Sequence, residues 1–152
     1  MWLDLPTFNT VVMSTPLVAI DLIVRKPNGD TLLGLRINRP AYGFWFVPGG
    51  RIQKNETLDD AFRRLTHEEL GHTFERADAQ LLGVFEHFYD DSVFANAGNG
   101  PDTHYVVLGY CLTLAENQVL EPPTEQHRHY RWWPLDELRY SPRVHENTRA
   151  YF

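Results

Sequence analysis

Residues 50–71 read GRIQKNETLDDAFRRLTHEELG, and this stretch carries the clearest structural signal in the chain. It predicts a helix over residues 58–70, because Thr57 is a suitable N-terminal cap and acidic residues fill the first turn. Gly71 stands where a helix-ending glycine belongs. Both ends of the helix are therefore marked in the sequence.

The predicted helix is amphipathic, and at about 100° per residue its apolar stripe consists of Leu58, Ala61, Phe62 and Leu65. Glu69 falls in the middle of this stripe. A buried carboxylate needs a cation, a hydrogen-bond donor or a metal, whereas a glutamate in a last helical turn commonly reaches water. Periodicity alone favours neither reading. Arg64 and Glu68 have the spacing of a surface ion pair, which spacing alone does not exclude as their role.

Strand patterns lie on both sides of this helix. We expect strands at residues 17–24, 31–36, 44–47, 80–88, 104–114 and 129–133. Polar loops are predicted at residues 37–43, 91–101 and 118–126, and a final helix begins near either Pro134 or Ser141. Strands that flank one strong helix predict an α/β fold with a mixed sheet packed between helices.

The composition excludes several classes of protein. Of 152 residues, 14 are Lys or Arg and 20 are Asp or Glu, and the net charge of −6 has the wrong sign for bulk binding to nucleic acid or anionic membranes. No apolar run approaches the ~20 residues of a membrane span. Cys111 is the only cysteine, and no basic residue precedes Arg25 as a secretory signal would require. We expect a cytoplasmic protein.

Residues 50–71 also contain a longer pattern of fixed spacing, made of Gly50, Glu56, Arg64, Glu68, Glu69 and Gly71. The pattern resembles the Nudix box, Gly-x5-Glu-x7-Arg-Glu-U-x-Glu-Glu-x-Gly-U, in which U is apolar. In that family the loop and helix of the box bind divalent metal, usually Mg²⁺, and position the diphosphate of a nucleoside diphosphate derivative. The resemblance implies the Nudix fold, in one domain over residues 1–152.

Leu65 departs from the box, because ordinary Nudix hydrolases have a metal-binding glutamate at this position. Thr66 and His72 also occupy positions that are usually apolar. The ordinary Nudix reaction is water attack on phosphorus, and it needs several metal ions that bridge the phosphates. With fewer carboxylates, this site can hold fewer metal ions. A different base is therefore needed.

The change at Leu65 resembles one branch of the family, the GDP-mannose mannosyl hydrolases. Further matching blocks are residues 14–18, 38–40, 45–51, 87–91, 103–109, 125–127 and 149–152. Members of this branch hydrolyse GDP-mannose, and also GDP-glucose, to GDP and free sugar by water attack at the anomeric carbon with inversion. GDP leaves readily once its charge is neutralised, so one Mg²⁺ and a base for the water are sufficient.

By resemblance the ligands of Mg²⁺ are the Gly49 carbonyl, Glu69 and Gln126. The resemblance also implies His127 as the general base, and an imidazole of ordinary pKa ~6.5 is suited to accept a proton near neutrality. Apart from the resemblance, His127 is one of seven histidines and lies in a polar loop. His129 competes for the role, because alternation along an extended strand points both side chains to one side. The sequence leaves this choice open.

Arg36, Arg51 and Arg64 are implied to lie near the diphosphate and the leaving oxygen, a role that suits the guanidinium fork. Each has the alternative of a solvated arginine. Tyr105 is implied to donate a hydrogen bond to the diphosphate, and is otherwise an ordinary strand aromatic.

Asp21 and His87 are implied to act at the sugar, where His87 would support charge near the sugar or the leaving group. Asp21 interrupts an apolar strand, so a buried and paired structural carboxylate is an equally good reading. Trp2, Leu3 and Phe8 match the segment that helps to hold the nucleotide in this branch. The resemblance to the branch also implies a homodimer. Terminal aromatics otherwise commonly cover the edge of a core.

The leading hypothesis is thus a Mg²⁺-dependent GDP-sugar hydrolase that cleaves the sugar C1–O bond. The alternative enzyme is an ordinary Nudix pyrophosphohydrolase, which would release a nucleoside monophosphate and a sugar phosphate. A third possibility is a Nudix-fold binding module without catalysis, against which the joint presence of Gly49, Glu69, Gln126 and His127 argues.

Overall fold

The computed structural model describes residues 2–94, 100–123 and 129–152, and these form a seven-stranded mixed sheet. Its strands are β1 (Leu17–Arg25), β2 (Thr31–Leu35), β3 (Trp45–Phe46), β4 (Gly49–Arg51), β5 (Gln80–Tyr89), β6 (Thr103–Thr113) and β7 (Tyr130–Trp133). The main path runs β3-β2-β1-β6-β5, while β4 pairs with β1 and β7 with β2. β1 runs parallel to β6 and antiparallel to β2 and β4, which makes the sheet mixed as predicted.

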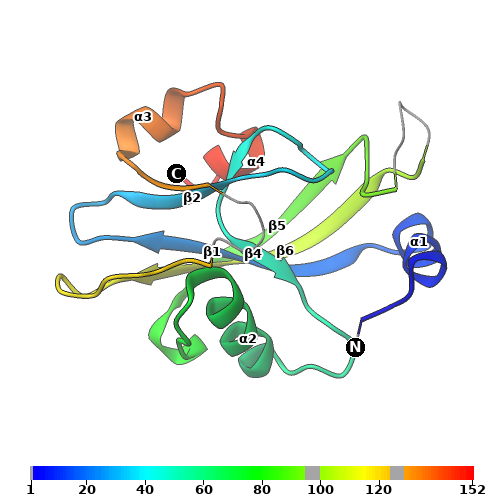
Figure 1. The fold of residues 1–152 in the computed structure, drawn as a ribbon, viewed down its shortest axis with the longest axis horizontal. Coiled ribbons are helices and arrows are strands. Elements are labelled where there is room, and N and C mark those ends of the chain that lie inside the picture. Colours follow the sequence, from blue (N-terminus) through cyan, green and yellow to red (C-terminus); the bar gives the residue numbers. More distant parts are fainter. Residues whose placement is uncertain (1, 95–99, 124–128) are drawn as a thin grey trace.

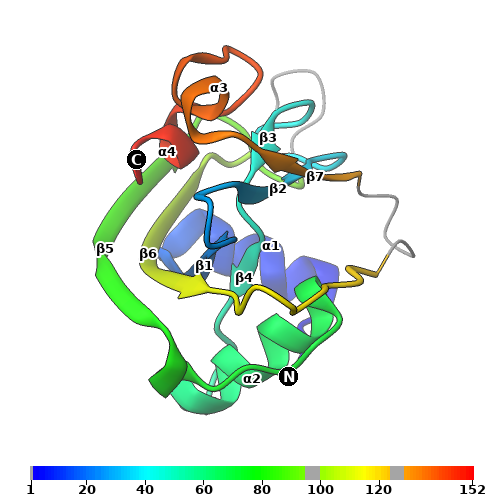
Figure 2. The same ribbon diagram turned by 90° about the vertical axis from the view of Figure 1, so that its left-hand side faces the viewer.

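Helices cover both sides of this sheet (Figures 1 and 2). α2 (Leu58–Leu70) lies on one side, and α3 (Leu135–Tyr140) and α4 (Glu146–Arg149) lie on the other. α1 (Leu5–Ser14) precedes β1 and contacts β6. A short 3-10 turn, Arg76–Asp78, follows α2. The expected α/β architecture is confirmed.

Alternation along β1 divides its side chains between two cores. Ile20, Leu22 and Val24 pack with the buried face of α2, whereas Ile23 packs with the cluster beneath α3 and α4. Asp21 is on the same face of β1 as Ile23, and this places its carboxylate on the α4 side.

α2 has the boundaries and ends that the sequence predicts. Thr57 Oγ1 accepts a hydrogen bond from the Asp60 amide at 3.1 Å, and Gly71 adopts the left-handed conformation with φ 72°. The predicted stripe is buried at Ala61, Phe62 and Leu65, but the prediction is wrong for Leu58, which is 39% exposed. Leu58 is the first residue of α2, and the buried residues of the helix begin at Ala61.

Two elements were not predicted. α1 was missed because its β-branched residues Thr7, Thr10, Val11 and Val12 are weak helix formers, and only Val12 is buried. No strand was expected at β4, since Gly49 and Gly50 normally end a strand. It forms because the backbone at Gly49 must approach β1 closely: a β-carbon there would overlap the Ile20 carbonyl oxygen.

Of the two predicted starts for the final helix, the one near Pro134 is confirmed, because α3 begins directly after it. Ser141 instead ends α3, and a further short helix, α4, begins after His145. Within the described residues, no helix combines the length and the apolar character needed to cross a membrane.

Gly71→Ala should destabilise the protein more than Gly29→Ala. Both glycines have positive φ, 72° and 94°, so each alanine has a left-handed penalty of about 1–2 kcal/mol. Only at Gly71 would the new β-carbon also overlap a backbone atom, the Glu121 carbonyl oxygen. We expect a further loss of about 1–3 kcal/mol in the free energy of unfolding, measured by urea denaturation. Equal losses in the two variants would contradict the close approach of residue 121 to the end of α2.

Candidate active site

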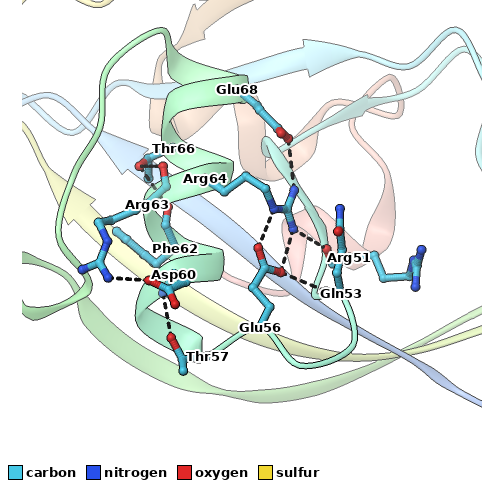
Figure 3. A network of polar contacts seen from close by, with 10 residues as sticks. All are labelled: Arg51, Gln53, Glu56, Thr57, Asp60, Phe62, Arg63, Arg64, Thr66 and Glu68. Carbon is cyan, nitrogen blue, oxygen red and sulfur yellow. Dashed lines mark hydrogen bonds and ion pairs between the residues drawn. The ribbon is translucent and has the colours of Figure 1, made fainter. Parts of the chain in front are cut away.

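An ion-pair network holds the loop before α2 against the helix (Figure 3). Arg64 lies between two glutamates, donating to Glu56 Oε1 at 2.6 Å and to Glu68 Oε2 at 3.1 Å. It also donates to the Arg51 carbonyl at 2.9 Å, and Glu56 accepts from the Gln53 amide at 2.9 Å. The hydrogen bonds from Arg64 hold the pKa of the Glu56 carboxyl below its ordinary value.

Arg64 therefore does more than form the surface pair with Glu68 that its spacing suggests. Its guanidinium joins the loop, the carbonyl of Arg51 in β4, and the helix itself. The Arg64 and Glu56 side chains are only 22% and 14% exposed, so solvent screens this pair less than a surface pair. A direct role of Arg64 toward a diphosphate stays a prediction.

Glu69 is buried in the face of α2 that packs against the sheet, with an exposed fraction of 8%. Of the two readings left open by periodicity, burial is confirmed. The Tyr130 hydroxyl of β7 donates to Glu69 Oε2 at 3.5 Å. Glu69 also lines a hollow of about 350 Å³ beside Gly49, Gly50 and Glu68.

The donors around this hollow fit a divalent cation that takes few ligands from protein. The carboxylates of Glu68 and Glu69 and the backbone oxygens of β4 are hard oxygen donors, which Mg²⁺ prefers. Residues 2–94, 100–123 and 129–152 contain no group of three or more acidic, histidine or cysteine side chains able to hold a metal. Leu65, which replaces the usual box glutamate, is 2% exposed and packs in the core between α2 and the sheet. The hollow thus suits a cation whose remaining ligands are phosphate and water.

A second pocket of about 90 Å³ opens on the other side of β4, on the face of β1 that carries Asp21, and we call it the α4-side pocket. It shares Gly49, Gly50 and Arg51 with the first hollow. Its polar lining also includes four residues named from the sequence, Asp21, Arg36, His87 and Tyr105, and one that was not named, Tyr89. The structure therefore brings Asp21, His87 and Tyr105 together, although β1, β5 and β6 contribute them separately.

Two arginines place positive charge at this pocket. Arg36 follows β2 and donates from Nε to the Pro40 carbonyl at 2.9 Å, and its guanidinium lies 5.7 Å from the Phe46 ring centre. The Arg51 guanidinium lies 4.9 Å from the centre of the Phe8 ring. These contacts hold the two guanidinium groups at the wall of the pocket.

Burial shifts two pKa values in this pocket in opposite directions. It raises the pKa of Asp21 to about 6, although the Tyr151 hydroxyl and Arg36 oppose the shift. It lowers the pKa of His87 to about 4, and the nearby His145 contributes to that shift. Burial also raises the pKa of Tyr105. At neutral pH, His87 is uncharged and Tyr105 is a hydrogen-bond donor.

The N-terminal residues lie beside the first hollow. Trp2 lines it with 78% of its surface exposed, and the Phe8 ring packs on Arg51 and edge-on to Phe94 at 5.6 Å. Leu3 is half-buried and lines neither cavity. Contact with a nucleotide stays a prediction for all three residues.

Gln126 and His127, the predicted ligand and base, lie outside the described residues. His129 is described and exposed, and its backbone carbonyl accepts from the Leu35 amide at 2.9 Å. The choice between His127 and His129 therefore stays open.

Sequence reasoning assigned no role to Tyr151, although its block 149–152 matched the branch. Its hydroxyl donates to Asp21 Oδ2 at 2.6 Å and lies 3.5 Å from His87 Nε2. No local signal could reveal this contact, because 130 positions separate Tyr151 from Asp21. Sequence reasoning also assigned no role to Tyr89 and Tyr130, which line the pocket.

Comparison with known proteins agrees with the box and the fold. Residues 15–152 match the NUDIX domain. The chain is 41% identical over 143 residues to the low-salt glycan biosynthesis protein Agl8 of Haloferax volcanii. The aligned region covers 86% of this chain and 87% of Agl8. It is 26% identical over 104 residues to an 8-oxo-dGTP diphosphatase of Proteus vulgaris, covering 68% of this chain and 81% of that protein. A MutT NUDIX hydrolase structure from Burkholderia pseudomallei superposes with TM-score 0.67 at 29% identity, over 91% of this chain and 96% of its own.

Asp21→Asn and His87→Gln should change the pH dependence of stability in opposite senses. The folded His87 pKa lies below the unfolded 6.5, so its burial costs stability as pH falls toward 4. The folded Asp21 pKa lies above the unfolded 3.8, so its burial costs stability as pH rises toward 6.

Between pH 6.5 and pH 4.5 each contribution changes by about 2 kcal/mol, with opposite sign. On acidification over this range, His87→Gln should gain stability relative to the unsubstituted protein, and Asp21→Asn should lose it. Urea denaturation at the two pH values measures both differences. The same sign in both variants would mean that the two groups are not buried as described.

Proposed function

Because the chain belongs to the NUDIX domain family, we propose that it hydrolyses GDP-mannose, and also GDP-glucose, to GDP and free sugar in a Mg²⁺-dependent reaction. Water attacks the anomeric carbon of the sugar with inversion, and phosphorus is not attacked. The observation that carries this proposal is Leu65: buried in the core, it leaves Glu68 and Glu69 as the carboxylates of the hollow beside β4. A site with so few described carboxylates is better suited to neutralising a leaving diphosphate than to clustering several metals.

The two cavities separate two tasks along one substrate. The hollow on the α2 side has the oxygen donors that suit a cation and a diphosphate, and the pocket on the α4 side has Asp21 and His87, which suit a sugar. The shared backbone of Gly49 and Gly50 lies between them, so the scissile C1–O bond would lie at β4. The relative named for glycan biosynthesis is consistent with sugar-nucleotide chemistry.

Residues of this chain would hold the diphosphate from two sides. Gly49, Glu69 and Gln126 would hold Mg²⁺, which when bound neutralises charge on the diphosphate and so makes GDP a better leaving group. Arg36 and Arg51 would bind phosphate oxygens with their free N–H groups, and the neutral Tyr105 hydroxyl would donate to another oxygen.

His127 would take the proton of the attacking water. Support comes from Tyr130, three residues further on, which lines the α4-side pocket and donates to Glu69. Tyr130 therefore lies close to both cavities. An imidazole is the general base suited to neutral pH, whereas the pKa of about 4 makes His87 a weak base.

A second copy of the chain is part of the proposal. α1 leaves Leu5 and Met13 exposed at 69% and 64%, and Trp2 at 78%, which is typical of a surface covered by a partner. The proposed partner is a homodimeric copy, and the proposed location is the cytoplasm.

The second candidate is an ordinary Nudix pyrophosphohydrolase. The box retains Glu56, Glu68 and Glu69, and one relative is named a diphosphatase. Such an enzyme would attack phosphorus and release GMP and mannose 1-phosphate.

Product analysis in ¹⁸O-labelled water distinguishes the two reactions. Purified protein with GDP-mannose and Mg²⁺ should yield GDP and mannose, with the label in mannose and inverted configuration at carbon 1. Omission of Mg²⁺, or addition of EDTA, should abolish turnover. GMP and mannose 1-phosphate with label on phosphorus would overturn the proposal in favour of the second candidate. Absence of Mg²⁺-dependent turnover on any GDP-sugar would indicate a binding module.

His127→Gln should lower kcat by about 10²–10⁴-fold while leaving nucleotide binding nearly unchanged, because a general base acts on water in the transition state. His129→Gln is the matched control and should retain kcat within a few-fold. Steady-state kinetics and calorimetric titration with GDP measure the two properties. The reverse result, with loss only in His129→Gln, would move the base to His129.

A further inference from the structure

Tyr151 lies at the end of the chain, yet its side chain is buried beside the α4-side pocket. Its exposed fraction is 8%, and its hydroxyl donates to Asp21 Oδ2 at 2.6 Å. The Tyr151 hydroxyl oxygen also lies 3.5 Å from His87 Nε2. Asp21 and His87 both line the pocket, whereas Tyr151 lies behind them. The phenol therefore joins two pocket residues that belong to β1 and β5.

The structure around Tyr151 fixes the position of this hydroxyl. The ring packs edge-on against Phe85 at 4.7 Å, and Gly109 leaves room for it, since a β-carbon there would lie 3.1 Å from Tyr151 Cε1. The Tyr151 amide donates to the Thr148 carbonyl at 3.1 Å. The fully buried Thr148 hydroxyl in turn accepts from the Val47 amide at 3.3 Å, next to β4. The C-terminal segment is thus attached to the pocket wall at two points.

The hydrogen on the phenol can serve only one acceptor. At 2.6 Å the Asp21 carboxylate is the stronger and closer acceptor, so the phenol donates to Asp21. Toward His87 the phenol oxygen can then only accept, and the proton must come from His87 Nε2. Because burial keeps His87 neutral at pH 7, its Nδ1 then has a free lone pair. The chain of contacts has one direction, from His87 through Tyr151 to Asp21.

We propose that Tyr151 is a positioning residue of the active site, which orients the Asp21 carboxylate and holds His87 in the Nε2–H tautomer. Tyr151 contacts no substrate in this assignment and acts through the two residues it joins. The tautomer is a property of the protein without substrate, whereas the effect on turnover rests on the proposed function.

Tyr151→Phe removes the hydroxyl and keeps the ring that fills the space against Phe85. Tyr140→Phe is the matched control, because Tyr140 is 81% exposed and lies on α3. In nitrogen–proton NMR spectra of the imidazole rings without substrate, unsubstituted protein and Tyr140→Phe should show His87 as the Nε2–H tautomer. Tyr151→Phe should show a mixture or the Nδ1–H tautomer, since the acceptor at Nε2 is gone. An unchanged Nε2–H tautomer in Tyr151→Phe would overturn the assignment.

Turnover gives the second readout. A hydrogen bond to a charged group supports a loss of about tenfold to a hundredfold in kcat of Tyr151→Phe, with KM changed less than about threefold. In an Asp21→Ala background the loss caused by Tyr151→Phe should be smaller, because the carboxylate that the hydroxyl orients is already absent. A structural role alone would lower the free energy of unfolding, leave the tautomer unchanged, and give the same loss in the Asp21→Ala background. That set of results would refute a positioning role.

The two proposals fail separately. If the unsubstituted protein does not hydrolyse GDP-mannose, the proposed function fails, and the NMR comparison still decides whether Tyr151 controls His87. If GDP-mannose is hydrolysed and Tyr151→Phe keeps both the tautomer and kcat, only the role of Tyr151 is overturned.

Discussion

The close approach of β4 to β1 is the constraint on which both cavities depend. Gly49 pairs with Asp21 so closely that a β-carbon would overlap the Ile20 carbonyl and meet the Asp21 carboxylate. Backbone hydrogen bonds continue the approach on either side, from Leu22 to Pro48 and from Ile52 to Val18, both at 2.8 Å. Because β4 has no side chain at Gly49 or Gly50, its backbone forms the wall between the α2-side hollow and the α4-side pocket.

The ion-pair network of Glu56 and Arg64 fastens α2 to this wall. Arg64 reaches the Arg51 carbonyl of β4, so the position of the helix relative to β4 is fixed by a charged hydrogen bond as well as by packing. Such a contact adds geometric precision, because the planar guanidinium donates only in fixed directions. The consequence is functional: Glu69 on α2 and Gly49 on β4 are kept beside one hollow.

Both cavities combine positive and negative side chains. Arg51 and Arg64 line the α2-side hollow together with Glu68 and Glu69, and Arg36 and Arg51 line the α4-side pocket together with Asp21. Burial there opposes ionisation of Asp21 and protonation of His87 alike, so a neutral imidazole and a hydrogen-bonded carboxylate coexist near pH 7. Tyr151 joins the two by a single hydroxyl, and the electrostatics of the pocket therefore depends on the last turn of the chain.

The sequence by itself determined the elements whose signals are local. Thr57, Gly71 and the apolar stripe define α2 within 15 residues, and the same spacing placed Glu69 in that stripe, because helical periodicity fixes which residues share a side. The burial of Glu69 was decided by the tertiary structure. The sequence also placed the strands of the main sheet and the box residues. It did not determine α1, whose β-branched residues are weak helix formers, or β4, whose glycines are strand-breaking until β1 lies beside them. Only the tertiary structure decided that Asp21, His87 and Tyr151 meet, because contacts across 130 and 64 positions leave no local pattern and arise only when the sheet and α4 have packed.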